Sequence, residues 1–89
     1  MILTVAVIRV QNVSFAVVLV KRSITANSLK AEEVRKSLQV EHKVFPELPL
    51  ILASQDSWGR FQYSGRRDIV NFLCKIDSDR IPWKKYKFP

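Results

Sequence analysis

Two runs rich in β-branched residues, 2–10 and 13–21, are separated only by Gln11 and Asn12, and this arrangement constrains the fold more than any other feature. Two residues make the commonest hairpin loop, and asparagine tolerates the positive φ that such a loop requires. The sequence therefore predicts an antiparallel hairpin in which the two valines that flank the loop face each other.

The register of this hairpin makes both of its faces apolar. Ile8 would face Phe15 and Ala6 would face Val17, while the opposite face is also apolar away from the loop. A strand with one solvated side alternates with polar residues instead. We therefore expect the hairpin to be covered on both faces, by helices of the same chain or by a second subunit. The second alternative predicts a homo-oligomer, a structural or assembly protein whose homodimer forms through the apolar hairpin.

The rest of the chain predicts two helices and a second hairpin. Apolar residues at helical spacing indicate the helices, and a turn that Asp56 opens and Gly59 closes joins two short strands. The order is ββαββα and the fold class is α+β, a small sheet with the helices on a face. The single domain, residues 1–89, divides into a hairpin at 1–21, a helix at 28–39, a hairpin at 49–64, a helix at 66–76 and a basic-aromatic extended arm at 77–89.

Cysteine usage and the apolar N-terminal stretch bear on the compartment. The chain has one cysteine, Cys74, so an internal disulfide is excluded and a reducing, cytoplasmic compartment is expected. The apolar stretch is nearly long enough to cross a bilayer. Arg9, Gln11 and Asn12 lie in its middle, however, where a charge is costly in hydrocarbon. We therefore expect no membrane partner.

No residue pattern indicates catalysis, a metal site or a cofactor. His42 is the only histidine, and one histidine with one cysteine falls short of a zinc site. Asp77 and Asp79 lack the ligand-rich continuation of a calcium loop, and two glycines cannot build a phosphate-binding loop. Cys74 lies near a helix C-terminus and is expected to be a chemically quiet, buried or half-buried apolar group. An enzyme is therefore the least expected class.

Charge is distributed unevenly along the chain, whose formal net charge is +7. Residues 59–89 hold eight of the fifteen cations and three of the eight acids, and the last ten residues interleave cations with aromatics. A basic surface attracts phosphate backbones and acidic proteins. The leading interpretation is therefore a non-enzymatic, small basic binding module for nucleic acid or an acidic protein. The alternative is that the charge only keeps the protein in solution.

The expected anion contacts lie in the second predicted helix and in the arm. Arg66 and Arg67 open that helix, where free backbone N–H groups favour anions; alternatively they are solvated cations opposite Asp68. The aromatics of the arm either stack on bases or anchor the arm across the body while the lysines stay in water. If the arm folds back along the helix, one contiguous positive surface results. The candidate contact residues are Arg60, Arg66, Arg67, Lys84, Lys85, Lys87, Trp83 and Tyr86.

The stretch from Leu48 to Leu73 carries a weak resemblance to a known family. It contains a strand that opens after Pro49, a turn with Gly59, the sequence Tyr63-Ser64-Gly65 and an apolar helix. In these features it resembles the second half of a thioredoxin-like domain, which implies that Pro49 is the cis-proline of that family. The Cys-x-x-Cys motif of the family is absent. The resemblance therefore implies a degenerate thioredoxin-like domain without redox activity.

Overall fold

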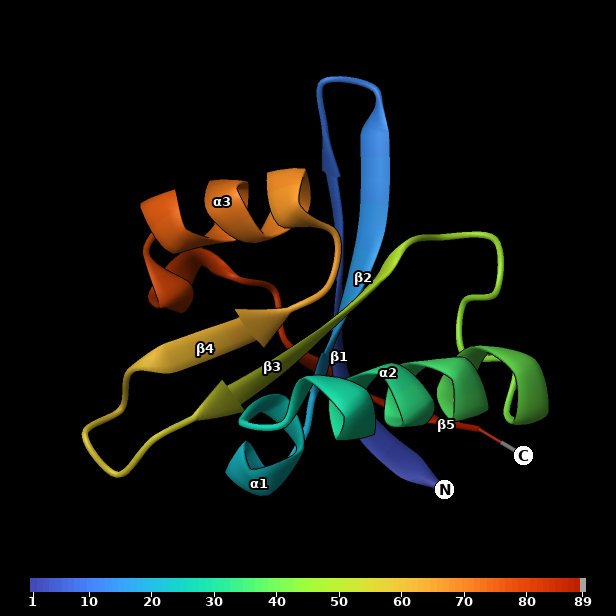
Figure 1. Cartoon of the computed structure of the whole chain (residues 1–89). Helices are drawn as coiled ribbons and strands as arrows, with labels where there is room; N and C mark the ends of the chain where they lie inside the picture. Colours follow the sequence, from blue (N-terminus) through green and yellow to red (C-terminus); the bar gives the residue numbers. More distant parts are fainter. Residues whose placement is uncertain (89) are drawn as a thin grey trace.

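The computed structural model describes residues 1–88 and contains a five-stranded sheet with helices on both faces (Figure 1). The strands are β1 (Ile2–Val10), β2 (Val13–Leu19), β3 (Leu50–Gln55), β4 (Phe61–Ser64) and β5 (Lys84–Lys87). The helices are α1 (Arg22–Thr25), α2 (Ser28–Lys36) and α3 (Arg67–Lys75), with a π-helical segment η1 (Ser37–Glu41) and a 3-10 helix η2 (Ser78–Arg80). The strand order is β4-β3-β2-β1-β5, parallel between β2 and β3 and otherwise antiparallel. The α+β class that the sequence predicts is confirmed.

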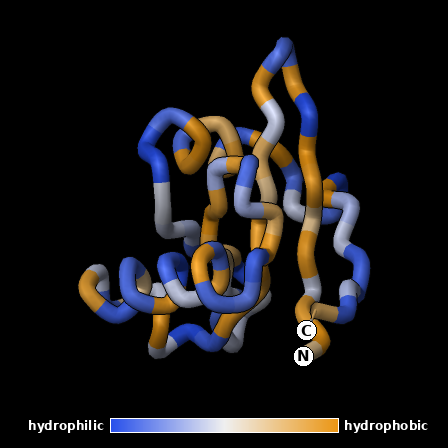
Figure 2. The backbone as a smooth tube through the Cα atoms, turned by 90° about the vertical axis from the view of Figure 1, so that its right-hand side faces the viewer, coloured by the Kyte–Doolittle hydropathy of each residue, from blue (hydrophilic) through white to orange (hydrophobic). Residues whose placement is uncertain are grey.

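The first hairpin forms in the predicted register. Val10 lies opposite Val13, and the pairing continues along both strands as the alternation of the sequence predicts. Gln11 and Asn12 have φ angles of 47° and 69°, the two positive values that a type I′ turn requires. The tip of this hairpin projects beyond the rest of the molecule (Figure 1), and its trace turns from apolar to hydrophilic there (Figure 2).

Helices of the same chain cover both faces of the sheet. One face packs against α3 and the segment after it. The hydrophobic cluster between them contains Ala6, Ile8, Phe15, Val17, Ile51, Ala53, Ile69, Leu73 and Ile81. The other face packs against α2, η1 and the loop that follows, and its buried residues are Val5, Ala16, Val18, Ala31, Leu38, Val44, Leu50 and Leu52.

The sequence predicts that the helices share one face of the sheet. Two connections explain why they lie on both faces instead. The crossover between the parallel strands β2 and β3 carries α1 and α2 over one side. The connection from β4 to β5 joins opposite edges of the sheet and carries α3 across the other side. The hairpin is therefore covered within the chain, which removes the observation on which a homodimer through its faces rested.

Only part of the arm expected at 77–89 is extended: residues 78–80 form η2, Lys84–Lys87 is a strand of the sheet, and residue 89 lies outside the described residues. β5 pairs antiparallel with β1, so that Lys84 lies opposite Val5 and Lys87 opposite Ile2. The Met1 ammonium group donates to the Phe88 carbonyl oxygen at 2.9 Å, which brings the two ends of the chain together (Figure 2). The arm thus completes the β1 edge of the sheet and does not fold back along α3.

The connection after β2 differs from its expected form. A short helix, α1, occupies the stretch expected to be a polar turn, and its Thr25 hydroxyl group lies 2.6 Å from the hydroxyl group of the buried Ser54. Asn27 then caps α2 through its side chain, as the sequence predicts. The helical path continues through η1 to Glu41, two residues beyond the predicted end.

Two sequence-based expectations concern single features of the backbone. No peptide bond among residues 1–88 is cis, so Pro49 does not have the conformation that the thioredoxin-like resemblance implies. No helix among the same residues is long and apolar enough to cross a membrane.

Candidate functional site

One end of the α3 side of the sheet carries two lysines on an exposed surface. α3 packs near the hairpin tip, where its Phe72 ring meets Phe15 with centroids 6.3 Å apart (Figure 1). Side chains alternate along a strand, so the same face continues toward the chain termini at every second residue. There Lys85 pairs with Thr4 and Lys87 with Ile2, and we call these four residues the open sheet end. Both lysines are exposed and the Ile2 side chain is 67% exposed.

A row of three aromatic rings borders the open sheet end. The rings of Tyr63 and Phe61 stack at 6.2 Å with an interplanar angle of 12°, and those of Phe61 and Trp83 at 5.8 Å with 16°. The sheet carries the small residues Ala6 and Ala53 on this face, both fully buried, which leaves room for the rings. Because Trp83 directly precedes β5, this aromatic row connects the β4 side of the sheet to the lysines of β5.

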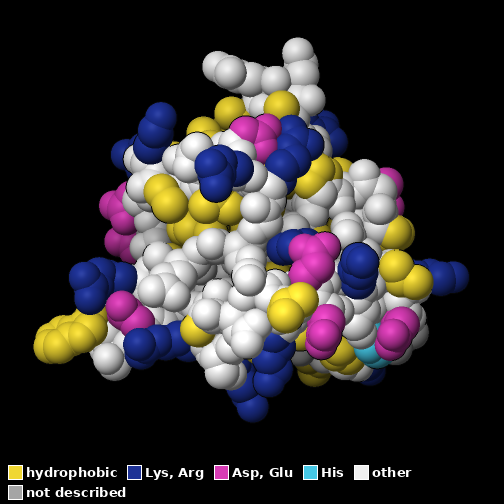
Figure 3. Space-filling model, in the orientation of Figure 1, with side chains coloured by type: hydrophobic (Ala, Val, Ile, Leu, Met, Phe, Trp, Pro, Cys, Tyr) yellow, Lys and Arg dark blue, Asp and Glu magenta, His cyan; other side chains and the backbone are white. Residues whose placement is uncertain are grey.

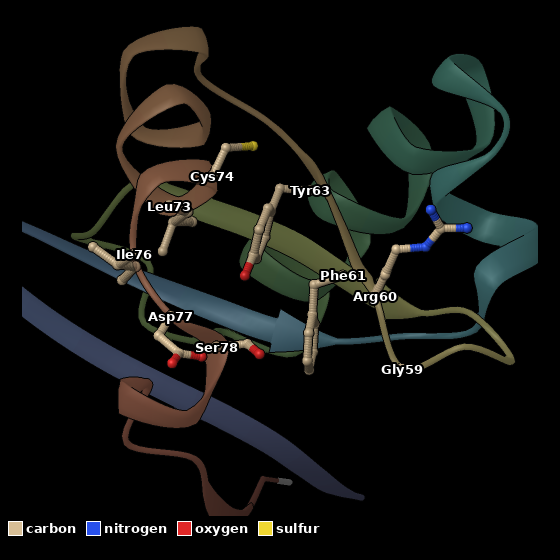
Figure 4. Close-up of a pocket in the computed structure, with 9 residues that line it drawn as sticks. All are labelled: Gly59, Arg60, Phe61, Tyr63, Leu73, Cys74, Ile76, Asp77 and Ser78. Atoms are coloured by element: carbon tan, nitrogen blue, oxygen red, sulfur yellow. The ribbon is translucent and has the colours of Figure 1, made fainter.

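A pocket of about 410 Å³ lies between β4 and the C-terminal end of α3, and we call it the α3–β4 pocket (Figure 4). Its lining comprises Gly59, Arg60, Phe61, Tyr63, Leu73, Cys74, Ile76, Asp77 and Ser78. Figure 4 shows the Arg60 guanidinium group directed away from the pocket, so the polar groups near its base are those of Asp77 and Ser78. Burial raises the pKa of the Tyr63 phenol, which therefore stays neutral at physiological pH.

Arg66, which directly precedes α3, is paired with an acid in the first turn of that helix. Its guanidinium group donates to both carboxylate oxygens of Asp68, at 2.7 and 2.8 Å. These hydrogen bonds lower the pKa of Asp68 to about 2, so the carboxylate stays charged. The interpretation of Arg66 as a solvated cation paired with Asp68 is therefore the one the structure favours. Arg67, the first residue of α3, is exposed.

The contiguous positive surface expected from these arginines and the arm lysines does not form. Asp68 lines a small pocket with Val10, at the tip end of β1, whereas Lys85 and Lys87 pair with the opposite end of that strand. At about 3.3 Å per residue, the nine residues of β1 separate its ends by roughly 26 Å. The prediction was wrong because the arm pairs with the sheet edge and leaves α3.

Arg60 belongs to the turn between β3 and β4. Its guanidinium group lies 3.3 Å from the Asp56 carboxylate, which also accepts from the backbone N–H groups of Trp58 and Arg60 at 2.9 Å. The hydrogen bond from the Arg60 backbone is the main cause that lowers the pKa of Asp56. The charge that Arg60 was expected to offer a ligand is therefore paired locally with Asp56, and Trp58 is 82% exposed in the same turn.

The aromatic residues of the arm anchor it, and its lysines stay exposed. Tyr86 packs edge-on against Phe45 on the α2 side, with centroids 5.4 Å apart, while Trp83 packs against Phe61 on the α3 side. The anchored-arm alternative is thus confirmed. Tyr86 and the open sheet end lie on opposite faces, and so Tyr86 leaves the set of residues that one ligand could contact there. Lys84 is exposed and lies on the Tyr86 side of the strand.

Strand pairing segregates the charge of the molecule. Residues 1–31 and 80–89 together hold eight cations and no acid, whereas residues 32–79 hold seven cations and all eight acids. Because β5 pairs with β1 and β1 with β2, these two acid-free segments lie side by side. The lowest part of the surface in Figure 3, below α1, accordingly shows cations without acids. Sequence reasoning missed this grouping since the segments are the two ends of the chain.

The sequence predicts a buried or half-buried Cys74, and this prediction was wrong. Cys74 is exposed, and it lines the α3–β4 pocket next to the buried Leu73. Sequence reasoning also missed the pocket residues Tyr63 and Asp77, although the alternation of Phe61 and Tyr63 did place both rings on one face. No group of three metal-ligating side chains gathers among residues 1–88.

Comparisons with known proteins add no relative to this description. No protein-family model, no curated protein and no solved structure matches the chain.

Proposed function

We propose that the protein is a non-enzymatic binding module for single-stranded nucleic acid. The strand would lie across the open sheet end, with its phosphates on Lys85 and Lys87 and its bases toward the aromatic row. The observation that carries this proposal is the juxtaposition of exposed lysines with half-buried rings in the acid-free part of the fold.

The chemistry of the surface favours a nucleic acid over an acidic protein as the partner. Lysines attract any polyanion, and rings beside them add a flat surface on which the exposed bases of a nucleic acid can stack. A duplex hides its bases within the helix, which favours single strands. Lys21 and Arg22, which follow β2 on the far side of β1, extend the acid-free surface beyond the strand itself.

A homodimer formed through the hairpin receives less support. The residues of β1 and β2 that would form such an interface, among them Val5, Ala6 and Val17, are fully buried within the chain. We therefore place the assembly alternative second.

Fluorescence anisotropy with a labelled dodecathymidylate tests the proposal across a salt series from 50 to 200 mM. We expect micromolar or weaker binding that falls steeply with salt, because released counterions supply the driving force. Replacing Lys84, Lys85 and Lys87 with Ala should lower the salt slope by about 1.4 units, because Lys85 and Lys87 each contribute roughly 0.7 through a single-strand phosphate contact and Lys84 lies on the opposite face of β5. The matched control replaces Lys36, Lys43 and Lys75 with Ala, removes the same charge from outside the acid-free segments, and should keep most of the slope.

Three results would contradict the proposal. Equal losses in the two triple variants would show that only net charge matters. Tighter binding of an acidic polypeptide such as polyglutamate than of the oligonucleotide would identify an acidic protein as the partner. Absence of binding at 50 mM salt would leave the charge as a solubility feature.

A further inference from the structure

The α3–β4 pocket has the shape of a slot for a flat ring. Figure 4 shows the rings of Tyr63 and Phe61 side by side, and the apolar side chains of Leu73 and Ile76 stand across the pocket from Tyr63. Phe61 stacks on one face of the Tyr63 ring, so Tyr63 is the end of the aromatic row and its other face borders the pocket. Such a gap between an aromatic ring and aliphatic side chains suits a planar heteroaromatic group.

The polar groups of the slot lie at its base. Asp77 caps η2, Ser78 begins it, and both residues line the pocket near the Tyr63 hydroxyl group. The Asp77 side chain accepts from the backbone N–H of Asp79 at 3.3 Å, which orients the carboxylate and leaves its remaining acceptor positions for a ligand. Ion pairs among residues 1–88 do not include Asp77. A carboxylate accepts hydrogen bonds and donates none, so the Asp77 end of the slot favours a ligand whose edge carries N–H groups.

We propose that the α3–β4 pocket holds one base of the bound strand and selects bases that carry an exocyclic amino group, with Asp77 as the acceptor. Cytosine, adenine and guanine present such a group. Thymine and uracil have only the N3–H donor, which is flanked by two carbonyl oxygens that would face the carboxylate unfavourably. This inference rests on the proposed function, and it adds selectivity among single strands to it.

The position of the pocket fits a strand that also reaches the lysines. The two ring spacings place the centres of Tyr63 and Trp83 within about 12 Å of each other, and Lys85 follows Trp83 by two residues. A stacked strand rises about 3.4 Å per nucleotide and an extended strand more, so roughly two to four nucleotides cover that distance. One base in the pocket and phosphates on Lys85 and Lys87 are therefore compatible with a single path along the aromatic row.

Comparing labelled dodecamers of cytidine and thymidine nucleotides tests the inference at constant salt. We expect the native protein to bind the cytidine dodecamer about fivefold to tenfold more tightly, the discrimination of one hydrogen-bonded base edge. Asp77→Asn should abolish or reverse this ratio, because the amide adds a donor for the thymine carbonyl while its oxygen still caps η2. Asp79→Asn removes the same charge from a neighbouring residue outside the pocket and should leave the ratio unchanged.

Cys74 provides a second measurement that does not depend on a variant's folding. Attaching a bulky maleimide to this exposed thiol should fill the pocket, remove the cytidine preference and preserve the salt-dependent binding to β5. The cytidine dodecamer should in turn slow this alkylation more than the thymidine dodecamer does.

The outcomes separate this inference from the proposed function. Equal affinities of the native protein for the two dodecamers would overturn base selection and leave the binding module intact. A cytidine preference that survives Asp77→Asn and alkylation of Cys74 would place the selecting site elsewhere. Absence of binding by either dodecamer would overturn both proposals.

Discussion

At the scale of the residue, local ion pairs decide which cations are available to a ligand. Arg35, Arg60 and Arg66 each lie against an acid no more than four residues away in sequence. Lys85 and Lys87, by contrast, have no carboxylate within ion-pair distance among residues 1–88. Exposed ion pairs contribute little to stability, but they reduce the field that a surface presents to a polyanion. Of the cations in the most basic stretch of the sequence, the unpaired lysines therefore attract a polyanion more strongly than the paired arginines do.

The pair formed by Arg66 and Asp68 makes a prediction about pH. The folded-state pKa of Asp68, about 2, lies below the ordinary value of 3.8. Its stabilising contribution is therefore fully present above about pH 4 and is lost as the pH falls through 2. Following the carboxyl carbon of Asp68 by NMR should show this low midpoint, and Arg66→Gln should raise it toward the ordinary value. A midpoint near 3.8 in the native protein would contradict the pairing.

At the scale of the element, turn chemistry and pairing determine how each end of the sheet is completed. The type I′ turn is tight enough to specify the register of β1 and β2 without help from the core. β5 completes the opposite edge of β1, and its three lysines make that edge a poor template for pairing with another chain. Two of these lysines, Lys85 and Lys87, also provide the proposed phosphate contacts.

The first turn position offers a test of this hairpin. Gln11 has a φ of 47°, which costs a residue with a Cβ atom free energy that glycine does not incur. Gln11→Gly should therefore raise the free energy of unfolding by about 0.5–1 kcal/mol, measured by urea denaturation. Gln11→Ala retains the Cβ atom and should bring no such gain. A loss of stability with glycine would mean that the turn has a different conformation.

At the scale of the whole molecule, coverage of both sheet faces and segregation of charge act together. The two hydrophobic clusters lie on opposite sides of the sheet, so the apolar hairpin is the centre of the molecule. Acids are confined to residues 32–79, which leaves the β1–β5 edge basic. The feature that distinguishes the surface of this protein is therefore its basic edge, and not an apolar surface large enough for obligate association.

Sedimentation equilibrium at tens of micromolar protein tests the consequence for assembly. We expect the mass of one chain, because the residues that would form a hairpin-mediated dimer already lie in the core. Raising the salt concentration should not change this mass, since hydrophobic burial and not charge repulsion holds these residues inside. A dimer that persists when the protein is diluted would restore the assembly alternative.

Much of the fold follows from local sequence signals. The β-branched runs and the short Gln11-Asn12 loop determine the first hairpin, and helical spacing of apolar residues determines α2 and α3. Both signals act between near neighbours in the chain, so they can be recognised in the sequence without the tertiary structure. The candidate contacts Lys85, Lys87 and Trp83 were likewise identified from the interleaving of cations and aromatics in the arm.

Long-range pairing decided the rest, because its partners are far apart in the chain. Nothing local indicates that the arm joins β1, that Trp83 stacks on Phe61, or that α3 covers the face opposite α2. These contacts depend on which edge of the sheet is free and on which apolar face remains to be covered. The sequence by itself therefore determined the elements and the chemistry available for a site, and the tertiary structure decided which of those groups meet on one surface.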